Sequence, residues 1–249
     1  MPNLVDQAIC IRQWDWSETS QTTSLFCRRH GILRGLAKGA RRERGSFSGG
    51  IELLALGEIV AVTKPDRELQ TLTQWTLLSI FRRPHDDLET NLHGLAMADL
   101  VHRFLPPMVP HEQLFDSMLA ALEAMESGER PAPEFLRFFL ALLRETGHEP
   151  RLDPTGIAPS RLAFDAAAGG IVDHATHPRG WRMRPETAHV LALVARGEPP
   201  ELCEPDAVDR ANRLLAHYAR TIVGEGMLAL ALATEPRVRP VPRAATQAE

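Results

Sequence analysis

The hydrophobic period of this chain changes near residue 80, and this change limits the folds that it can adopt. Up to that point, short apolar segments with alternating side chains are separated by polar or glycine turns, as in β-strands. We predict strands at residues 7–14, 22–28, 32–38, 51–64 and 69–75, the fourth one bent at Gly57. Five short strands in about 80 residues favour a small closed barrel of the OB type.

Beyond residue 80, apolar side chains recur every three or four residues, which predicts helices at residues 85–105, 112–126, 131–146, 185–196 and 205–223. Residues 149–184 contain Pro, Gly, Asp and His without a period, so we expect an irregular insertion. The predicted class is α+β, with an OB-fold domain at 1–80 and a mostly helical domain at 81–235 that holds the insertion. Residues 236–249 are expected to be a disordered tail.

Composition excludes several other classes of protein. The chain has 249 residues, 44% hydrophobic, with a net charge of −4, as in ordinary soluble domains. Three distant cysteines without a CxxC pair provide neither a disulfide framework nor a zinc ribbon, and we expect small, buried thiols in a reducing compartment. The N-terminus does not resemble a secretory signal and no apolar run is long enough to span a membrane, so a cytoplasmic protein is expected.

The overall negative charge hides a basic segment. Between residues 28 and 44 there are seven Lys or Arg side chains and one Glu, a net charge of +6. Six glycines between residues 31 and 50 make this segment Gly-rich, but the Walker A and GxGxxG patterns are absent. A local cluster of this kind suits the backbone of a nucleic acid, and the alternative is a solvated loop whose arginines pair with acids elsewhere.

Several motifs in order resemble the RecO recombination-mediator family of bacterial DNA repair. They are WSETS at residues 16–20, the LAKGARR segment at 36–42, the helical motif at 137–143 followed by Thr146-Gly147, and Phe164 with Gly169-Gly170. The resemblance covers about residues 5 to 175. It implies a non-enzymatic, nucleoid-associated protein with an OB-fold and a helical domain that binds single- and double-stranded DNA and anneals complementary strands. It also implies action with RecR and the single-strand-binding protein SSB to load RecA on gapped DNA.

The basic segment supplies the DNA-binding candidates. They are Lys38, Arg41, Arg42 and Arg44, with Arg34 and Arg28 as weaker ones. Trp14 and Trp16 have two interpretations. The favoured one is that they plug the barrel beside a turn, and the alternative is that they are exposed and stack on bases.

Arg137 is a partner-binding candidate, because the resemblance implies that a basic residue at this position receives the acidic, Phe-ended tail of SSB. A guanidinium beside Leu136 and Phe138 suits a terminal carboxylate and a ring. The alternative is an arginine that extends from a core helix to water. Phe139 stands where the family often has Glu.

Many relatives hold a metal with four cysteines, and here Asp153, Thr155, Asp173 and Thr176 stand in that stretch. Zinc coordination of that kind cannot form, and no cofactor is expected. His174 and His177 are interpreted as surface residues of a metal-free hairpin, and an improvised site with Asp173 is the alternative.

Two other functions are alternatives to the DNA-binding mediator. An OB-fold protein–protein adaptor without intrinsic DNA binding is the first. A hydrolase that uses His and Asp from residues 173–189 is disfavoured, because HExxH and GxSxG motifs are absent. Residues 224–233 are apolar where many relatives are basic, which argues against a DNA contact there.

Overall fold

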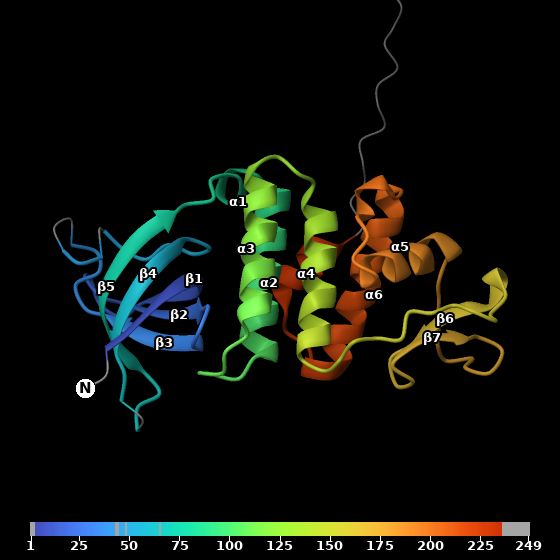
Figure 1. The fold of residues 1–249 in the computed structure, drawn as a ribbon, viewed down its shortest axis with the longest axis horizontal. Helices are drawn as coiled ribbons and strands as arrows, with labels where there is room; N and C mark the ends of the chain where they lie inside the picture. Colours follow the sequence, from blue (N-terminus) through green and yellow to red (C-terminus); the bar gives the residue numbers. More distant parts are fainter. Residues whose placement is uncertain (1–2, 43–44, 48, 65, 236–249) are drawn as a thin grey trace, which may run out of the picture.

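Five strands close into a barrel at one end of the molecule, and helices follow along its long axis (Figure 1). The computed structural model describes residues 3–42, 45–47, 49–64 and 66–235. The strands are β1 (Asn3–Asp15), β2 (Gln21–Cys27), β3 (Gly31–Ala37), β4 (Leu56–Val62) and β5 (Gln70–Ser79). Their order is β1-β2-β3-β5-β4, and β4 returns to β1. This closed barrel confirms the predicted OB-like fold.

The fourth strand is shorter than the predicted 51–64, because residues 53–54 form a turn in which Leu54 has a positive φ of 63°. The predicted bend is present, as the register of β4 against β5 shifts between Leu56 and Gly57. A Cβ on Gly57 would lie 2.4 Å from the indole of Trp75, which is itself only 2% exposed. Glycine is therefore needed here because a large ring fills the barrel interior.

The helices are α1 (Arg83–Asp86), α2 (Leu88–Phe104), α3 (Glu112–Glu126), α4 (Pro131–Glu145), α5 (Pro185–Ala195), α6 (Pro205–Val223) and α7 (Leu228–Thr234), with 3-10 turns η1 (Pro159–Arg161) and η2 (Pro200–Leu202). The predicted helix at 85–105 is divided at Asp87. This residue is extended and its carboxylate accepts a hydrogen bond of 2.8 Å from the Thr90 N–H, so it caps α2. Helix α7 was not predicted.

The segment predicted as irregular contains a small sheet. Strands β6 (Leu162–Asp165), β7 (Gly170–Asp173) and β8 (Trp181–Arg182) pair in the order β7-β6-β8. These strands have two to four residues each, too few to show an alternating pattern between turn residues. Figure 1 places this sheet, with α5 and α6, at the opposite end of the molecule from the barrel.

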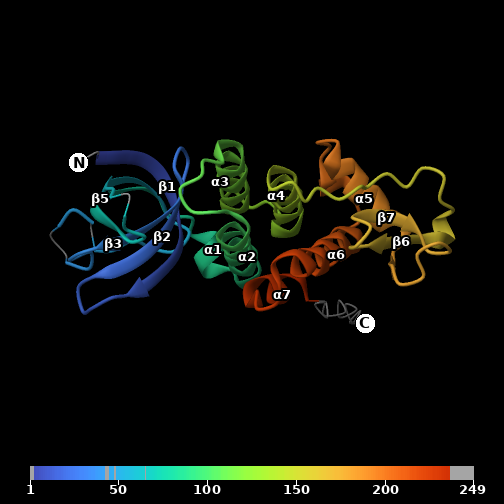
Figure 2. The same ribbon diagram turned by 90° about the horizontal axis from the view of Figure 1, so that it is seen from below.

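The barrel is packed onto the helical domain through a shared apolar core. Ile9 and Ile11 of β1 belong to the same buried cluster as side chains of α2, α3 and α4. Phe26 and Phe115 are both fully buried and meet edge to face, with ring centroids 5.5 Å apart. Figure 2 shows the same end-to-end arrangement from below. Within the described residues, no helix has the length and hydropathy needed to cross a membrane.

Candidate nucleic-acid interface

Two loops at one end of the barrel are hydrogen-bonded to each other. The Arg41 N–H donates to the Thr19 carbonyl at 3.1 Å, and the Gly39 N–H donates to the Ser20 hydroxyl at 3.2 Å. The Arg41 guanidinium also pairs with Asp15. These contacts join the basic turn at residues 38–42 to the β1–β2 hairpin loop at residues 16–20.

Trp14 and Trp16 flank this junction and are exposed by 50% and 63%. The favoured interpretation, that they plug the barrel, is therefore wrong. The reason is that β1 pairs with β4 only as far as Ile9, and its last residues, 12–15, pair with β2 alone. This hairpin extends past the closed barrel, so side chains on both of its faces meet water. Trp75 occupies the interior instead.

The basic candidates differ in how much of their charge is available. Lys38 and Arg42 are exposed, and among the ion pairs of the described residues none involves either of them. Arg41 pairs with Asp15, and Arg34 pairs with Glu68. Arg44 lies outside the described residues. Lys38 and Arg42 therefore present the least compensated charge of this turn.

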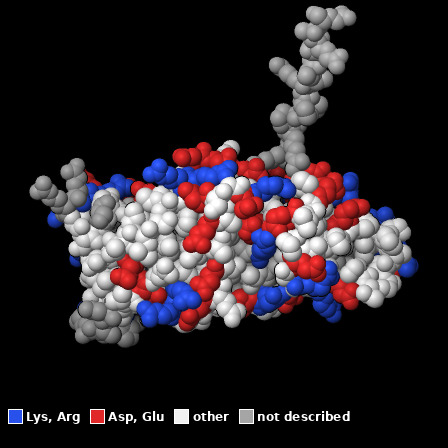
Figure 3. All heavy atoms as spheres, turned by 45° about the horizontal axis from the view of Figure 1, so that its top comes forward, with Lys and Arg blue, Asp and Glu red and all other residues white. Residues whose placement is uncertain are grey.

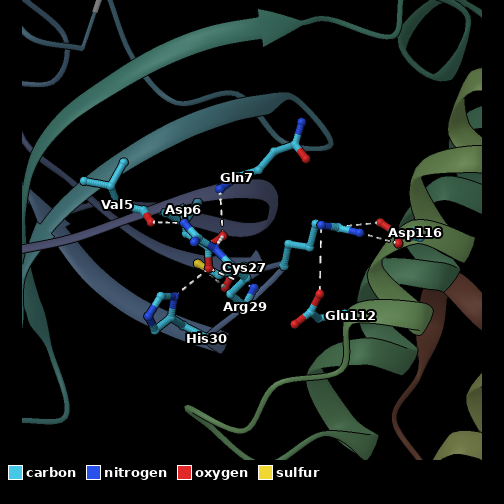
Figure 4. A network of polar contacts seen from close by, with 10 residues as sticks. Val5, Asp6, Gln7, Cys27, Arg29, His30, Glu112 and Asp116 are labelled. Carbon is cyan, nitrogen blue, oxygen red and sulfur yellow. Dashed lines mark hydrogen bonds and ion pairs between the residues drawn. The ribbon is translucent and has the colours of Figure 1, made fainter.

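Arg28 is placed elsewhere, at the joint between the barrel and α3. Its guanidinium donates two hydrogen bonds of 2.8 Å to Asp116, and it lies 3.9 Å from Glu112 (Figure 4). The hydrogen-bonded guanidinium lowers the pKa of Asp116, and the carboxylate raises the pKa of Arg28. Its role as a DNA contact remains a prediction, but its charge is already matched.

A buried carboxylate organises the turn beside Arg28. Asp6 is 2% exposed and accepts hydrogen bonds from the Arg29 N–H at 2.9 Å and the Gln7 N–H at 2.9 Å. It also contacts His30 Nδ1 at 2.6 Å and Arg29 Nε at 3.5 Å (Figure 4). These bonds satisfy the buried charge and fix the β2–β3 turn.

Sequence reasoning missed two basic residues, Lys64 and Arg67, in the loop between β4 and β5. With Arg34 and Met108 they line a hollow of about 410 Å³. The loop is held by the buried Gln70 side chain, which accepts from the Lys64 N–H at 2.7 Å and donates to the Lys64 carbonyl at 3.1 Å. No local signal marks these residues. Only the parallel pairing of β3 with β5 brings this loop beside Arg34.

Charge is not spread evenly over the barrel. Figure 3 shows a face on which the area over the barrel, at the left, carries few charges, whereas acidic and basic side chains alternate over the helices. Exposed apolar side chains of β5, Leu77 and Leu78, account for part of the uncharged barrel surface of the molecule. On the face that Figure 3 shows, the described residues form no continuous positive surface over the barrel.

Arg137 is held by two carboxylates, one from Glu134 of its own helix and one from Glu201 of η2. Its side chain is 38% exposed, whereas the neighbouring Phe138 and Phe139 are fully buried. Burial raises the pKa of Glu134, and the Arg137 guanidinium opposes that change. The arginine is therefore accessible but not unpaired, and its binding role remains a prediction.

The zinc site of many relatives does not fit the residues found here. Asp153 accepts hydrogen bonds from the Thr155 N–H and hydroxyl, and Asp173 pairs with Arg161 at 3.2 Å. Over the described residues, no three His, Cys, Asp or Glu side chains are grouped so that they could hold a metal ion. Cys10 and Cys27 are buried and Cys203 is half-buried, as expected of structural thiols. Burial raises the pKa of Cys10 to about 12, so this thiol is inert.

Two family models match this chain: Recombination protein O N terminal over residues 1–81, and Recombination protein O C terminal over residues 85–229. A protein of Rhodopirellula baltica described as DNA repair protein RecO is 30% identical over 210 residues, which are 81% of this chain and 77% of the relative. Proteins of the same description from Salinibacter ruber and an Anaeromyxobacter species are 29% and 30% identical. Each alignment covers 76% of this chain, and 73% and 76% of the respective relative.

Proposed function

This chain belongs to the recombination protein O family and is a DNA repair protein of that type, and we propose that it acts by binding single- and double-stranded DNA and annealing complementary strands. The observation that carries the proposal is the hydrogen-bonded junction of the basic turn with the hairpin that bears Trp14 and Trp16. Charge and exposed aromatic rings meet there on one barrel.

Each part of this junction matches one part of a DNA strand. Lys38 and Arg42 are exposed cations that suit phosphates, and their binding releases counterions into solution. Exposed indoles suit unpaired bases, because every base has a flat face on which an aromatic ring can stack. Lys64 and Arg67 lie in the β4–β5 loop, which the pairing of β3 with β5 brings beside Arg34. They extend the basic surface along the barrel. Such a surface binds DNA strands without a preference for their base sequence.

The proposed partners follow from the family. We propose that the protein works with RecR, and that it receives the acidic tail of SSB at Arg137 and thereby assists the loading of RecA. The binding of the SSB tail is supported by the half-exposed Arg137 guanidinium, which already pairs with the Glu201 carboxylate that a tail carboxylate can replace. We also propose that no metal and no bond-making chemistry are required, since Asp153 and Asp173 are engaged by other groups.

A salt series tests the DNA interface. The anisotropy of a labelled single-stranded oligonucleotide is measured with the wild type, with the double variant Lys38→Ala/Arg42→Ala, and with Arg196→Ala as control. Arg196 is an exposed arginine of the helical domain, paired with Glu198 at 2.7 Å. Loss of two phosphate contacts lowers the slope of log affinity against log salt by about 1.4.

The control should keep the wild-type slope. If the wild type binds no oligonucleotide even at low salt, DNA binding by the isolated chain is rejected. An adaptor that acts through protein contacts alone then becomes the better hypothesis.

A further inference from the structure

A second basic hollow lies far from the barrel, between β8, α5 and α6. Its volume is about 430 Å³, within the range of ligand sites, roughly 300–1,000 Å³. Its lining includes four arginines, Arg182, Arg184, Arg210 and Arg213, together with Trp181. Figures 1 and 2 both show α5, α6 and the small sheet at the end of the molecule opposite the barrel. This hollow is thus separate from the interface described above.

The positive charge of the hollow favours a negatively charged ligand. None of the side chains that line it is acidic. Arg210 is oriented by a hydrogen bond of 3.2 Å from its Nε to the Thr187 hydroxyl, and Glu204 lies 3.8 Å from its Nη2. Arg182 and Arg184 are exposed at the rim. Four guanidinium groups, from β8, the start of α5 and α6, can contact several phosphate oxygens at once.

An aromatic ring is fixed in the same hollow. Trp181 is 36% exposed, and one face of its indole lies on the buried Phe164, with ring centroids 6.0 Å apart and planes 11° apart. His217 lies 5.3 Å away at a tilt of 52°. Phe164 is itself held edge to face by Tyr218. The indole is therefore held in place before any ligand arrives, so that stacking a planar group on its accessible surface costs little ordering.

We propose that this hollow binds a nucleotide unit of a single-stranded nucleic acid, with the base against Trp181 and the flanking phosphates against Arg210 and Arg213. The inference rests on the proposed function and adds a second strand contact to it. Arginines and an exposed aromatic ring that line the same hollow match the phosphates and the base of a nucleotide unit. An acidic peptide can also pair with the guanidinium groups, but its carboxylates do not use the exposed indole of Trp181, so the nucleic acid is favoured.

The position of the hollow has a mechanical consequence. The shared core fixes the barrel to the helices, so the two sites are held at opposite ends of one body. A nucleic-acid strand bound at the barrel raises the effective concentration, near it, of a second segment bound at the hollow. Two segments, or two strands, can then be held by one protein, as annealing requires.

Photo-crosslinking tests the site directly. A short oligonucleotide that carries 5-iodouracil is irradiated with the full-length protein, and the adducts are mapped by mass spectrometry. We expect an adduct at Trp181 in the wild type and in Lys38→Ala/Arg42→Ala, and a yield about tenfold lower in Arg210→Ala/Arg213→Ala. Arg196→Ala is the matched control and should behave as the wild type. If the hollow variant melts early, Arg182→Ala/Arg184→Ala at the exposed rim replaces it, with the same expected loss.

The outcomes separate this inference from the proposed function. Adducts confined to the barrel, with the hollow variants unchanged, overturn the inference and leave the barrel interface intact. Loss of binding in the hollow variants, with the barrel variant unchanged, rejects the barrel interface and supports the hollow. An acidic peptide that binds the wild type but not Arg210→Ala/Arg213→Ala, without competing with the oligonucleotide, overturns the inference in favour of a protein partner.

Discussion

Arg28 and Asp116 lie 88 residues apart in the sequence, and two hydrogen bonds of 2.8 Å join them across the boundary between the barrel and α3. Close by, Phe26 and Phe115 make the apolar part of the same joint. The Arg28–Asp116 ion pair at the surface, called the clasp below, and the ring contact in the core thus orient the barrel relative to the helices. The distance between the basic turn and the far hollow depends on that orientation.

The clasp predicts a dependence of stability on pH. The pKa of Asp116 is lowered from its ordinary value of 3.8, chiefly by the hydrogen bonds from Arg28. A carboxyl with a lowered pKa contributes stability that is present above its unfolded pKa and is lost as pH falls through the folded one. Asp116→Asn should therefore be slightly less stable than the wild type near neutral pH. The difference should fade below about pH 4.

Urea midpoints measured across that range provide the check. Because both side chains are about half-exposed, the difference is expected to be small and to shrink further in salt. A difference that grows as pH falls would contradict the account.

Gly31 predicts a large loss of stability on substitution. Its φ is +67°, and a Cβ would lie 1.9 Å from the Val109 carbonyl oxygen, so Gly31→Ala meets both backbone strain and a clash with backbone. The matched control is Gly147→Ala, where φ is +75° but nothing lies within 4 Å. We expect a cost of about 1 kcal/mol for Gly147→Ala and at least about 3 kcal/mol for Gly31→Ala. Urea unfolding measures both, and equal costs would show that the contact with Val109 is not tight.

Long helices were the most predictable part of this fold. The bounds predicted for α3 and α6 agree with the structure, because several turns of apolar side chains define the buried face and proline begins α6. The hairpin expected in the insertion is present as β6 and β7, but its bounds and the third strand were missed, since strands of two to four residues are too short to establish a period. The long helices could be predicted because residue type and spacing along one element define them. The small sheet could not, because it depends on pairing between strands.

The candidate site was less predictable, because pairing between distant residues decides which charges are free. Nothing near Arg28 in the sequence shows that Asp116 compensates it, and nothing near Lys64 shows that barrel closure brings it beside Arg34. Trp14 was expected to be buried. It is exposed because β1 continues beyond Ile9, the last residue that pairs with β4. The chemistry of each residue was visible in the sequence, but its partners were not.

Trp16 is expected to contribute to strand binding without contributing charge. If its exposed indole stacks on a base, Trp16→Ala weakens binding of a single-stranded oligonucleotide by about 1–3 kcal/mol. The slope of log affinity against log salt should stay unchanged, because stacking releases no counterions. Trp16→Phe should restore most of the affinity, since a phenyl ring also stacks.

Anisotropy titrations at several salt concentrations distinguish this from a folding defect. Leu202→Ala, which removes a 90% exposed apolar side chain of the helical domain, is the control. An unchanged affinity in Trp16→Ala would remove this indole from the interface.

Glu201 should compete with an acidic ligand for Arg137. Its carboxylate pairs with the same guanidinium group that we propose for the SSB tail, so a tail must displace it. Arg137→Ala is therefore expected to weaken binding of an SSB C-terminal peptide by about tenfold or more, because a charged hydrogen bond is lost. Glu201→Gln should strengthen binding several-fold, since a neutral amide holds arginine less tightly. Peptide titrations measure both, with Glu198→Gln as the control for a nearby exposed acid. Neither Arg137→Ala nor Glu201→Gln should change oligonucleotide affinity, and a peptide that binds all four proteins equally would place the tail elsewhere.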